Sequence, residues 1–158
     1  YPDRIKKLVM MGSGAGGPSY FVPMPAEGIK LLNAAYDNPT LENFRKMIQV
    51  FVYDASKISE DVLKLRYEGA LSNRAHLQAF IDSRKAPQRN LSAELDKIKV
   101  ETLCIFGKDD RFVPLDNGFR LLAGLPNCHL IIFNKCGHWV QFDQADLFNE
   151  YVTNFLKR

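Results

Sequence analysis

Two polar segments of the chain carry side chains that could do acid–base chemistry together. Asp110 stands three residues after Gly107, where an apolar run ends, and His138 stands after the next apolar run. A carboxylate that orients an imidazole is the acid and base of a nucleophilic triad. Because ligands of open α/β sheets bind beyond the carboxyl ends of the strands, we expect Asp110 and His138 to lie side by side there.

Each of these two residues also has a structural interpretation. Asp favours turns and helix caps, so Asp110 by itself could be a turn residue or a helix cap. His138 by itself, between Gly137 and Trp139, could be a histidine whose hydrogen bonds are satisfied within the fold. Their matched positions after consecutive strands favour the functional interpretation.

The hydrophobic pattern predicts a strand, a block of helices and then alternating strands and helices. Residues Lys7–Met11 precede a glycine loop over residues 12–18, so we expect them to form a buried strand. Helical periodicity then extends from Pro25 to about Asn90 and predicts four helices without an intervening strand. Thr40 and Ser59 carry the start signals of the second and third of these helices.

After the helical block the pattern predicts a strand over 100–106, a helix over 115–125, a strand over 129–133 and a helix over 145–157. Strands joined through helices form a parallel sheet that is covered on both faces, so the fold class is α/β with a helical insertion. Three strands are fewer than the five or six of an ordinary sheet, and we expect neighbouring strands upstream of Tyr1.

Composition excludes several classes of protein. The chain has 158 residues, a net charge of +3 and 46% hydrophobic residues, which is typical of one globular domain and excludes disordered and fibrous proteins. No block of five or six like charges is present, so nucleic acid is not expected as a partner. The apolar runs are far shorter than the roughly 20 residues that cross a bilayer, and no membrane partner is expected.

The cysteines indicate the cellular compartment, and the first residue indicates whether the chain is part of a longer protein. Three irregularly spaced cysteines predict neither a disulfide framework nor a zinc site and favour the reducing cytoplasm. The chain opens at Tyr1 without an initiator Met or a leader, which indicates a processed product or a piece of a longer protein.

Seven segments spread along the chain resemble one enzyme family. They are Gly14–Pro18, Pro23–Leu32, Val50–Asp54, Arg66–Glu68, Lys85–Pro87, Asp109–Asp116 and Lys135–Trp139. Together they resemble the meta-cleavage-product hydrolases of the α/β-hydrolase superfamily. These enzymes hydrolyse a carbon–carbon bond in vinylogous diketones made by ring opening of catechols.

The resemblance implies a role for each matching residue. Asp110 matches the triad acid, with Asp109 its non-catalytic neighbour, and His138 matches the triad histidine, which also helps to ketonise the dienol substrate. Arg66 matches the lid arginine that holds the carboxylate and 2-oxo end of the substrate, a task suited to a forked cation. Trp139 matches the substrate-binding aromatic beside the histidine. The other matches line the pocket, with the larger ones around an apolar substrate tail: Gly14, Ile29, Leu32, Met47, Phe51, Phe112 and Val113.

Without the resemblance, some of these residues would be interpreted differently. Arg66 would be a solvated or salt-bridged arginine. The helical spacing of Ile29, Leu32, Met47 and Phe51 would be explained by core packing alone.

The resemblance also implies the architecture, the C-terminal part of an α/β-hydrolase fold with about three parallel strands and a four-helix lid. Residues 1–18 would form a core strand and glycine loop, residues 19–92 the lid, and residues 93–158 the C-terminal core. The implied partner is a small dienoate substrate, with no cofactor and no metal. A homo-oligomer is left open.

The sequence departs from the family at the nucleophile. The family's Gly-x-Ser-x-Gly elbow does not occur in these 158 residues, and Ser13 has Met11 and Ala15 at the flanking positions instead of glycine. We expect the serine and its oxyanion-hole amides upstream of Tyr1. The isolated chain should then be inactive, with the strand 7–11 as an unpaired apolar edge.

Two alternatives stay open at this point. A truncated α/β-hydrolase remnant could serve as a ligand-binding or dimerisation module, or an esterase could share the same core with a different lid.

Overall fold

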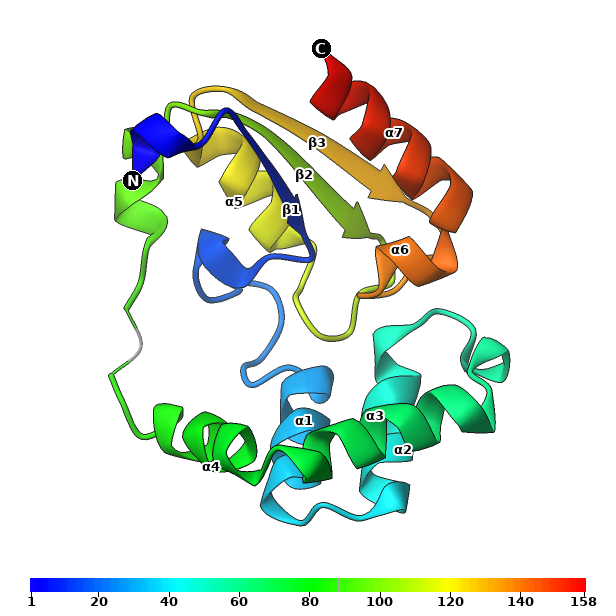
Figure 1. Ribbon diagram of the computed structural model, residues 1–158. Helices are drawn as coiled ribbons and strands as arrows, with labels where there is room; N and C mark the ends of the chain where they lie inside the picture. Colours follow the sequence, from blue (N-terminus) through cyan, green and yellow to red (C-terminus); the bar gives the residue numbers. More distant parts are fainter. Residues whose placement is uncertain (88) are drawn as a thin grey trace.

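The computed structural model describes residues 1–87 and 89–158. Figure 1 shows a small sheet flanked by helices in one half of the molecule and a separate layer of helices in the other half. The strands are β1 (Lys7–Met11), β2 (Glu101–Gly107) and β3 (Cys128–Phe133). The helices are α1 (Glu27–Asp37), α2 (Leu41–Phe51), α3 (Glu60–Ser72), α4 (Arg74–Ser83), α5 (Asp116–Gly124), α6 (Val140–Asp143) and α7 (Ala145–Lys157). Short 3-10 helices cover Pro2–Arg4, Gly14–Gly16, Ala55–Lys57 and Ser92–Lys97.

The sheet is parallel, as predicted, with the order β1-β2-β3. Val9 pairs with Leu103, and Leu103 pairs with His129, so β2 is the central strand. The prediction that β1 is a buried strand is wrong, because all five of its residues are only partly buried. Within the described residues β1 has a neighbour on one side alone, whereas β2 lies between two strands and is buried from Thr102 to Gly107.

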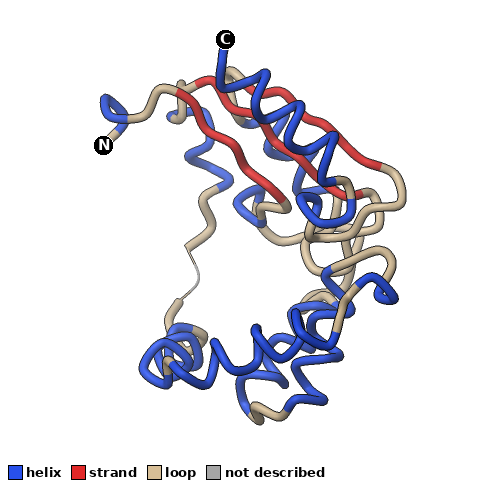
Figure 2. Tube along the Cα trace, turned by 45° about the vertical axis from the view of Figure 1, so that its right-hand side comes forward, coloured by secondary structure: helices blue, strands red, loops and turns tan. Residues whose placement is uncertain are grey.

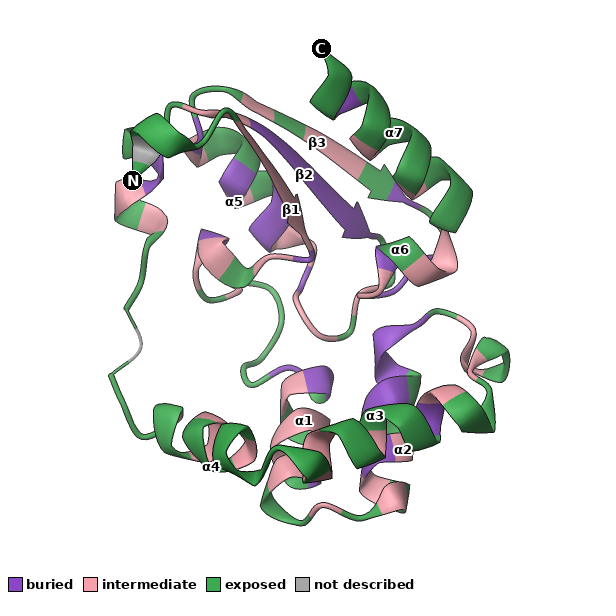
Figure 3. Cartoon of the chain, viewed as in Figure 1, coloured by how far each residue is buried: buried purple, intermediate pink, exposed green. Residues whose placement is uncertain are grey.

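Helices cover both faces of the sheet, which the parallel pattern predicted. Side chains of β2 alternate between the faces, with Leu103 and Ile105 on one and Cys104 and Phe106 on the other. The first face packs against α6 and α7 in a cluster of Leu103, Ile105, Phe133, Cys136, Val140 and Phe155. The second face packs against α5 in a cluster of Leu95, Cys104, Phe106, Leu121 and Leu125. Figure 3 shows β2 as the most buried strand of the sheet.

The four helices α1 to α4 form a layer of their own, set apart from the sheet in both Figure 1 and Figure 2. The predicted start signals are confirmed. Thr40 Oγ1 accepts a hydrogen bond from Asn43 N at 3.2 Å, and Ser59 Oγ accepts one from Val62 N at 3.3 Å. The layer has its own core of Ala35, Phe44, Met47, Ile48, Phe51 and Leu63. Residue 88, within the predicted lid, lies outside the described residues, and the predicted segment boundaries at 18 and 92 stay predictions.

The element boundaries agree with the sequence to within a residue or two. The helix predicted over 115–125 spans Asp116–Gly124, and the strand predicted over 129–133 begins at Cys128. Helix α6 was not predicted, because a single turn of four residues is too short to produce a hydrophobic period.

Candidate active site

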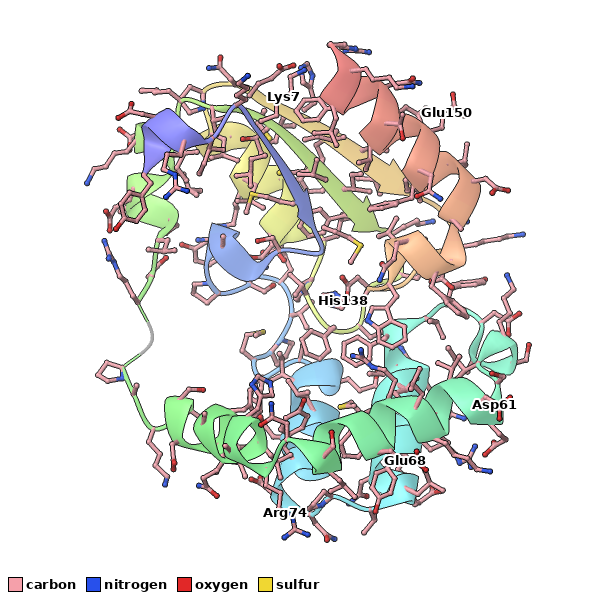
Figure 4. All side chains as sticks on the ribbon, in the orientation of Figure 1. Lys7, Asp61, Glu68, Arg74, His138 and Glu150 are labelled. Carbon is pink, nitrogen blue, oxygen red and sulfur yellow. The ribbon has the colours of Figure 1, made fainter. Side chains whose placement is uncertain are left out.

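Asp110 and His138 meet at the carboxyl ends of β2 and β3, between the sheet and the helical layer (Figure 4). Asp110 Oδ2 lies 2.9 Å from His138 Nδ1. The Asp110 side chain is fully buried, and the His138 side chain is 16% exposed. The expectation that residues after two consecutive strands come together is therefore confirmed.

The other oxygen of Asp110 fixes how the carboxylate points. Asp110 Oδ1 accepts hydrogen bonds from the backbone N–H groups of Phe112 at 2.7 Å and Val113 at 2.9 Å. Because these two donors hold Oδ1, Oδ2 is aimed at the imidazole. A carboxylate at Nδ1 favours the tautomer with its proton on that nitrogen, which leaves Nε2 as the acceptor.

Gly12, the first residue after β1, gives the histidine its space. A Cβ at this position would lie 2.7 Å from His138 Nδ1 and 2.8 Å from His138 Cε1, and the backbone has a φ of +51°. Both observations require glycine here. The sequence placed Gly12 in the glycine loop but gave it no role, and its one signal was its position directly after a strand.

The segment that carries His138 is also held close to β2. A Cβ on Gly107 would lie 2.1 Å from the carbonyl oxygen of Gly137, so the end of β2 touches this segment directly. Asp109 contributes from the next turn, because its carboxylate accepts a hydrogen bond from Cys136 N at 3.3 Å. Asp109 thus supports the backbone while Asp110 faces the histidine.

Aromatic rings pack around His138. The imidazole lies 4.7 Å from the ring of Phe112 and 5.4 Å from the ring of Phe51, centroid to centroid. Phe51 also stacks on Trp139 at 4.9 Å with 9° between the planes, and Trp139 N donates to the Phe51 carbonyl at 2.8 Å. The end of α2 is thereby attached to the segment that carries the histidine.

Asp143 makes a second connection between the same two segments, and sequence reasoning missed it. Its Oδ2 accepts hydrogen bonds from Gly137 N at 2.7 Å and from Tyr53 N, just past α2, at 2.9 Å. Among the described residues, Asp143 Oδ1 is buried without a hydrogen-bond partner. No feature of the sequence marked this aspartate, because its role depends on two backbone amides 90 and 6 residues away.

Arg66 contacts Trp139, the residue that directly follows His138. Its guanidinium carbon stands 5.3 Å from the centre of the Trp139 ring, in the range of a cation–π contact. The side chain comes from α3 and is exposed, so it can reach an anionic ligand. Arg66 and Met47 both line an open cavity of about 360 Å³.

The remaining predicted pocket residues separate into two groups. Gly14, Ile29, Phe112 and Val113 line one cavity of about 550 Å³. Leu32 and Phe51 pack into the core of the helical layer. The cavity has further lining residues that the sequence did not indicate, among them Arg89 and Asn90.

Two other nucleophilic side chains, those of Ser13 and Cys136, have structural roles or are protonated. Ser13 Oγ accepts a hydrogen bond from Ala15 N at 3.3 Å and caps the 3-10 helix Gly14–Gly16. Burial, with the carboxylates of Asp143, Asp110 and Asp109 nearby, raises the pKa of the Cys136 thiol to about 12, which keeps it protonated and unreactive at neutral pH.

Neither a metal site nor a membrane-spanning helix is found in residues 1–87 and 89–158. They contain no group of three or more His, Cys, Asp and Glu side chains placed to hold a metal ion. None of their helices has the length and apolar character needed to span a membrane.

Comparison with known proteins gives consistent matches over the whole chain. Residues 1–145 match the family described as the alpha/beta hydrolase fold. A 2-hydroxy-6-oxononadienedioate/2-hydroxy-6-oxononatrienedioate hydrolase from Burkholderia vietnamiensis is 51% identical over 161 residues, which cover 100% of this chain and 56% of that protein. The chain thus spans about half the length of the curated relatives it matches.

Solved structures agree with these relatives. The 2-hydroxy-6-oxo-6-phenylhexa-2,4-dienoate hydrolase from Rhodococcus sp. strain RHA1 superimposes with a TM-score of 0.83 at 28% identity, over 99% of this chain and 57% of that one. A meta-cleavage product hydrolase from Pseudomonas fluorescens IP01 superimposes with a TM-score of 0.79 at 30% identity, over the same shares.

Proposed function

The chain belongs to the family of the alpha/beta hydrolase fold, and from that premise we propose that it supplies the triad acid, the triad histidine and the lid of a carbon–carbon bond hydrolase of aromatic degradation. Its three-stranded parallel sheet corresponds to a C-terminal part of that fold. The substrate class is a 2-hydroxy-6-oxohexa-2,4-dienoate, and the nonadienedioate in the name of the Burkholderia relative is the first member to test.

The single observation that carries the proposal is the pair of Asp110 and His138. Asp110 holds Nδ1 at 2.9 Å and is itself held by two backbone amides, so the imidazole has one orientation. His138 then takes and returns protons through Nε2, and Asp110 stabilises the imidazolium that forms. Such fixation of one ring is what a proton transfer centre needs, and the partial exposure of His138 leaves Nε2 a path to substrate.

Arg66 anchors the carboxylate and 2-oxo end of the dienoate in this proposal. The guanidinium offers a fork of donors that matches a carboxylate in two-point contact. Its position over Trp139 supports this role, because Trp139 directly follows the histidine and places the anchored end near it.

The substrate tail occupies the cavity lined by Gly14, Ile29, Phe112 and Val113. Phe112 connects this cavity to the reacting centre, since its ring packs on the imidazole. Leu32, Met47 and Phe51 form the lid side of the binding region, where a packed core keeps the wall rigid.

The nucleophile is a serine on a strand-to-helix elbow outside these 158 residues, as is the oxyanion hole. The chain on its own is therefore inactive in this proposal, because the histidine has no hydroxyl to activate. The complete enzyme works in the cytoplasm, which the three free thiols support.

The test is the bleaching of a yellow 2-hydroxy-6-oxohexa-2,4-dienoate by the complete enzyme. His138→Ala should abolish ketonisation and cleavage, whereas Arg66→Ala should mainly impair the handling of the dienoate end. Arg74→Ala is the matched control, because Arg74 is an exposed arginine of α4, which Figure 4 shows on the side of the lid remote from His138.

Three outcomes would contradict the proposal. Normal turnover by both His138→Ala and Arg66→Ala would refute the residue roles. Cleavage of simple esters without cleavage of the dienoate would indicate an esterase. Binding of the dienoate without any cleavage by the complete protein would indicate a non-catalytic module.

A further inference from the structure

The cavity of about 550 Å³ extends from Phe112 to the polar linker that follows α4. On the histidine side it is lined by Phe112, whose ring packs on the imidazole. It is also lined by Arg89 and Asn90, which follow α4. Asn90 approaches the glycine loop at Gly17, where a Cβ would lie 3.1 Å from its Oδ1. The cavity thus lies between Phe112, which packs on the histidine, and a guanidinium on a different segment.

The surroundings of Arg89 leave its positive charge available to a ligand. Arg89 pairs with Glu94, but Glu94 also has Lys97 as a partner at 3.3 Å. A guanidinium has five N–H donors, so one carboxylate does not exhaust it. A second guanidinium, that of Arg120, stands beside Gly17 but donates to the Pro18 carbonyl and covers the Tyr20 ring, so it is Arg89 that lines the cavity. This side of the cavity therefore favours an anion.

Two arginines thus stand beyond the two ends of one aromatic row. The row runs from Trp139 through Phe51 to Phe112, with neighbouring ring centres 4.9 Å and 4.8 Å apart. Arg66 covers the Trp139 end, and the cavity with Arg89 opens at the Phe112 end. His138 packs on the two phenylalanines between them.

We infer that Arg89, with the amide of Asn90 beside it, binds the carboxylate at the tail end of a dicarboxylate substrate. The inference rests on the proposed function, in which Arg66 binds the carboxylate at the dienoate end. With Arg89 in this role, the tail subsite prefers a substrate with an anionic tail. The apolar lining residues alone would predict an apolar tail. Cleavage then releases a 2-hydroxypentadienoate on the Arg66 side and a dicarboxylic acid, succinate for the nine-carbon substrate, on the Arg89 side.

The experiment compares two substrates of the complete enzyme that differ at one group. One is the nine-carbon diacid, and the other carries a primary amide in place of the tail carboxylate. Arg89→Gln should lower kcat/KM for the diacid about 10- to 100-fold, mainly through KM, and change it less than about twofold for the amide. Arg89→Lys should restore part of the loss, and Arg74→Gln, which removes a charge from exposed α4, should change neither substrate.

Two results overturn the inference. An unchanged kcat/KM for the diacid in Arg89→Gln would show that the guanidinium does not bind the tail carboxylate. An equal loss on both substrates would assign Arg89 a structural role.

A binding measurement separates this inference from the proposed function. The diacid is titrated into the complete protein carrying His138→Ala, with and without Arg89→Gln, and the dissociation constant is measured by calorimetry. A 10- to 100-fold weaker Kd with Arg89→Gln supports the tail subsite even if the wild-type protein cleaves neither substrate, which would refute only the hydrolase. Equal Kd values refute the tail subsite even if the hydrolase assignment stands.

Discussion

Replacement of Gly12 by alanine tests whether the approach of β1 sets the position of the histidine. The new Cβ would lie 2.7 Å from His138 Nδ1, so the imidazole has to retreat by roughly 1 Å to reach an ordinary contact distance of 3.5–4.0 Å. Phe112 and Phe51 stand against the ring on other sides, at 4.7 Å and 5.4 Å, and limit where it can go. The displacement therefore acts on the 2.9 Å bond to Asp110.

Two terms set the size of the effect. A residue with a Cβ at a φ of +51° costs about 1–2 kcal/mol of stability relative to glycine. Displacement of a catalytic group by about 1 Å costs on the order of 100-fold in rate. We expect Gly12→Ala to lower kcat/KM of the complete enzyme about 100-fold and to reduce the free energy of unfolding by about 1–3 kcal/mol.

The bleaching of the dienoate gives kcat/KM, and urea unfolding gives the free energy of unfolding. Gly69→Ala is the matched control, because a Cβ on this glycine of α3 meets nothing within 4 Å. This change should raise helix stability by about 0.5–1 kcal/mol and leave kcat/KM unchanged. If Gly12→Ala keeps kcat/KM within about twofold of the wild type, the reasoning about His138 is refuted.

Three further changes test other parts of the structure. Asp143→Ala removes the acceptor of two backbone amides and should lower the free energy of unfolding by about 1–3 kcal/mol in urea, whereas no loss would show that water replaces the carboxylate. Thr40→Ala removes the cap of α2 and should cost about 1 kcal/mol in the same assay, with no change in kcat/KM, and an unchanged midpoint would contradict the capping role. The raised pKa of Cys136 means that the folded state retains a thiol proton which the unfolded state loses, so the free energy of unfolding should fall as pH rises from 9.0 toward about 12, and Cys136→Ala should flatten this slope.

Much of the fold was predictable because strong local patterns specify it. The strand Lys7–Met11 and the helix Ala145–Lys157 have the bounds that the hydrophobic pattern indicated. The partial exposure of β1 agrees with its expected place at an unpaired edge, although its own hydrophobic pattern predicted a buried strand.

The site divides in the same way. Asp110 and His138 could be paired in advance because parallel strands bring their carboxyl ends to one edge of a sheet. The contacts of Gly12 and Asp143 could not, because each depends on the distance between segments that only the folded chain brings together. The position of Arg89 at the cavity was not predictable for the same reason, since it stands in a polar linker where an arginine is ordinary.

The end of α2 is attached directly to the segment that carries His138. Phe51 accepts a hydrogen bond from Trp139 N, and Tyr53 donates one to Asp143, so the end of α2 and the residues around His138 move as one piece. In the proposed enzyme, a ligand that displaced the end of α2 would therefore also displace the imidazole. Substrate binding and the alignment of Nε2 would then be coupled, and a poorly fitting ligand would leave the histidine misaligned.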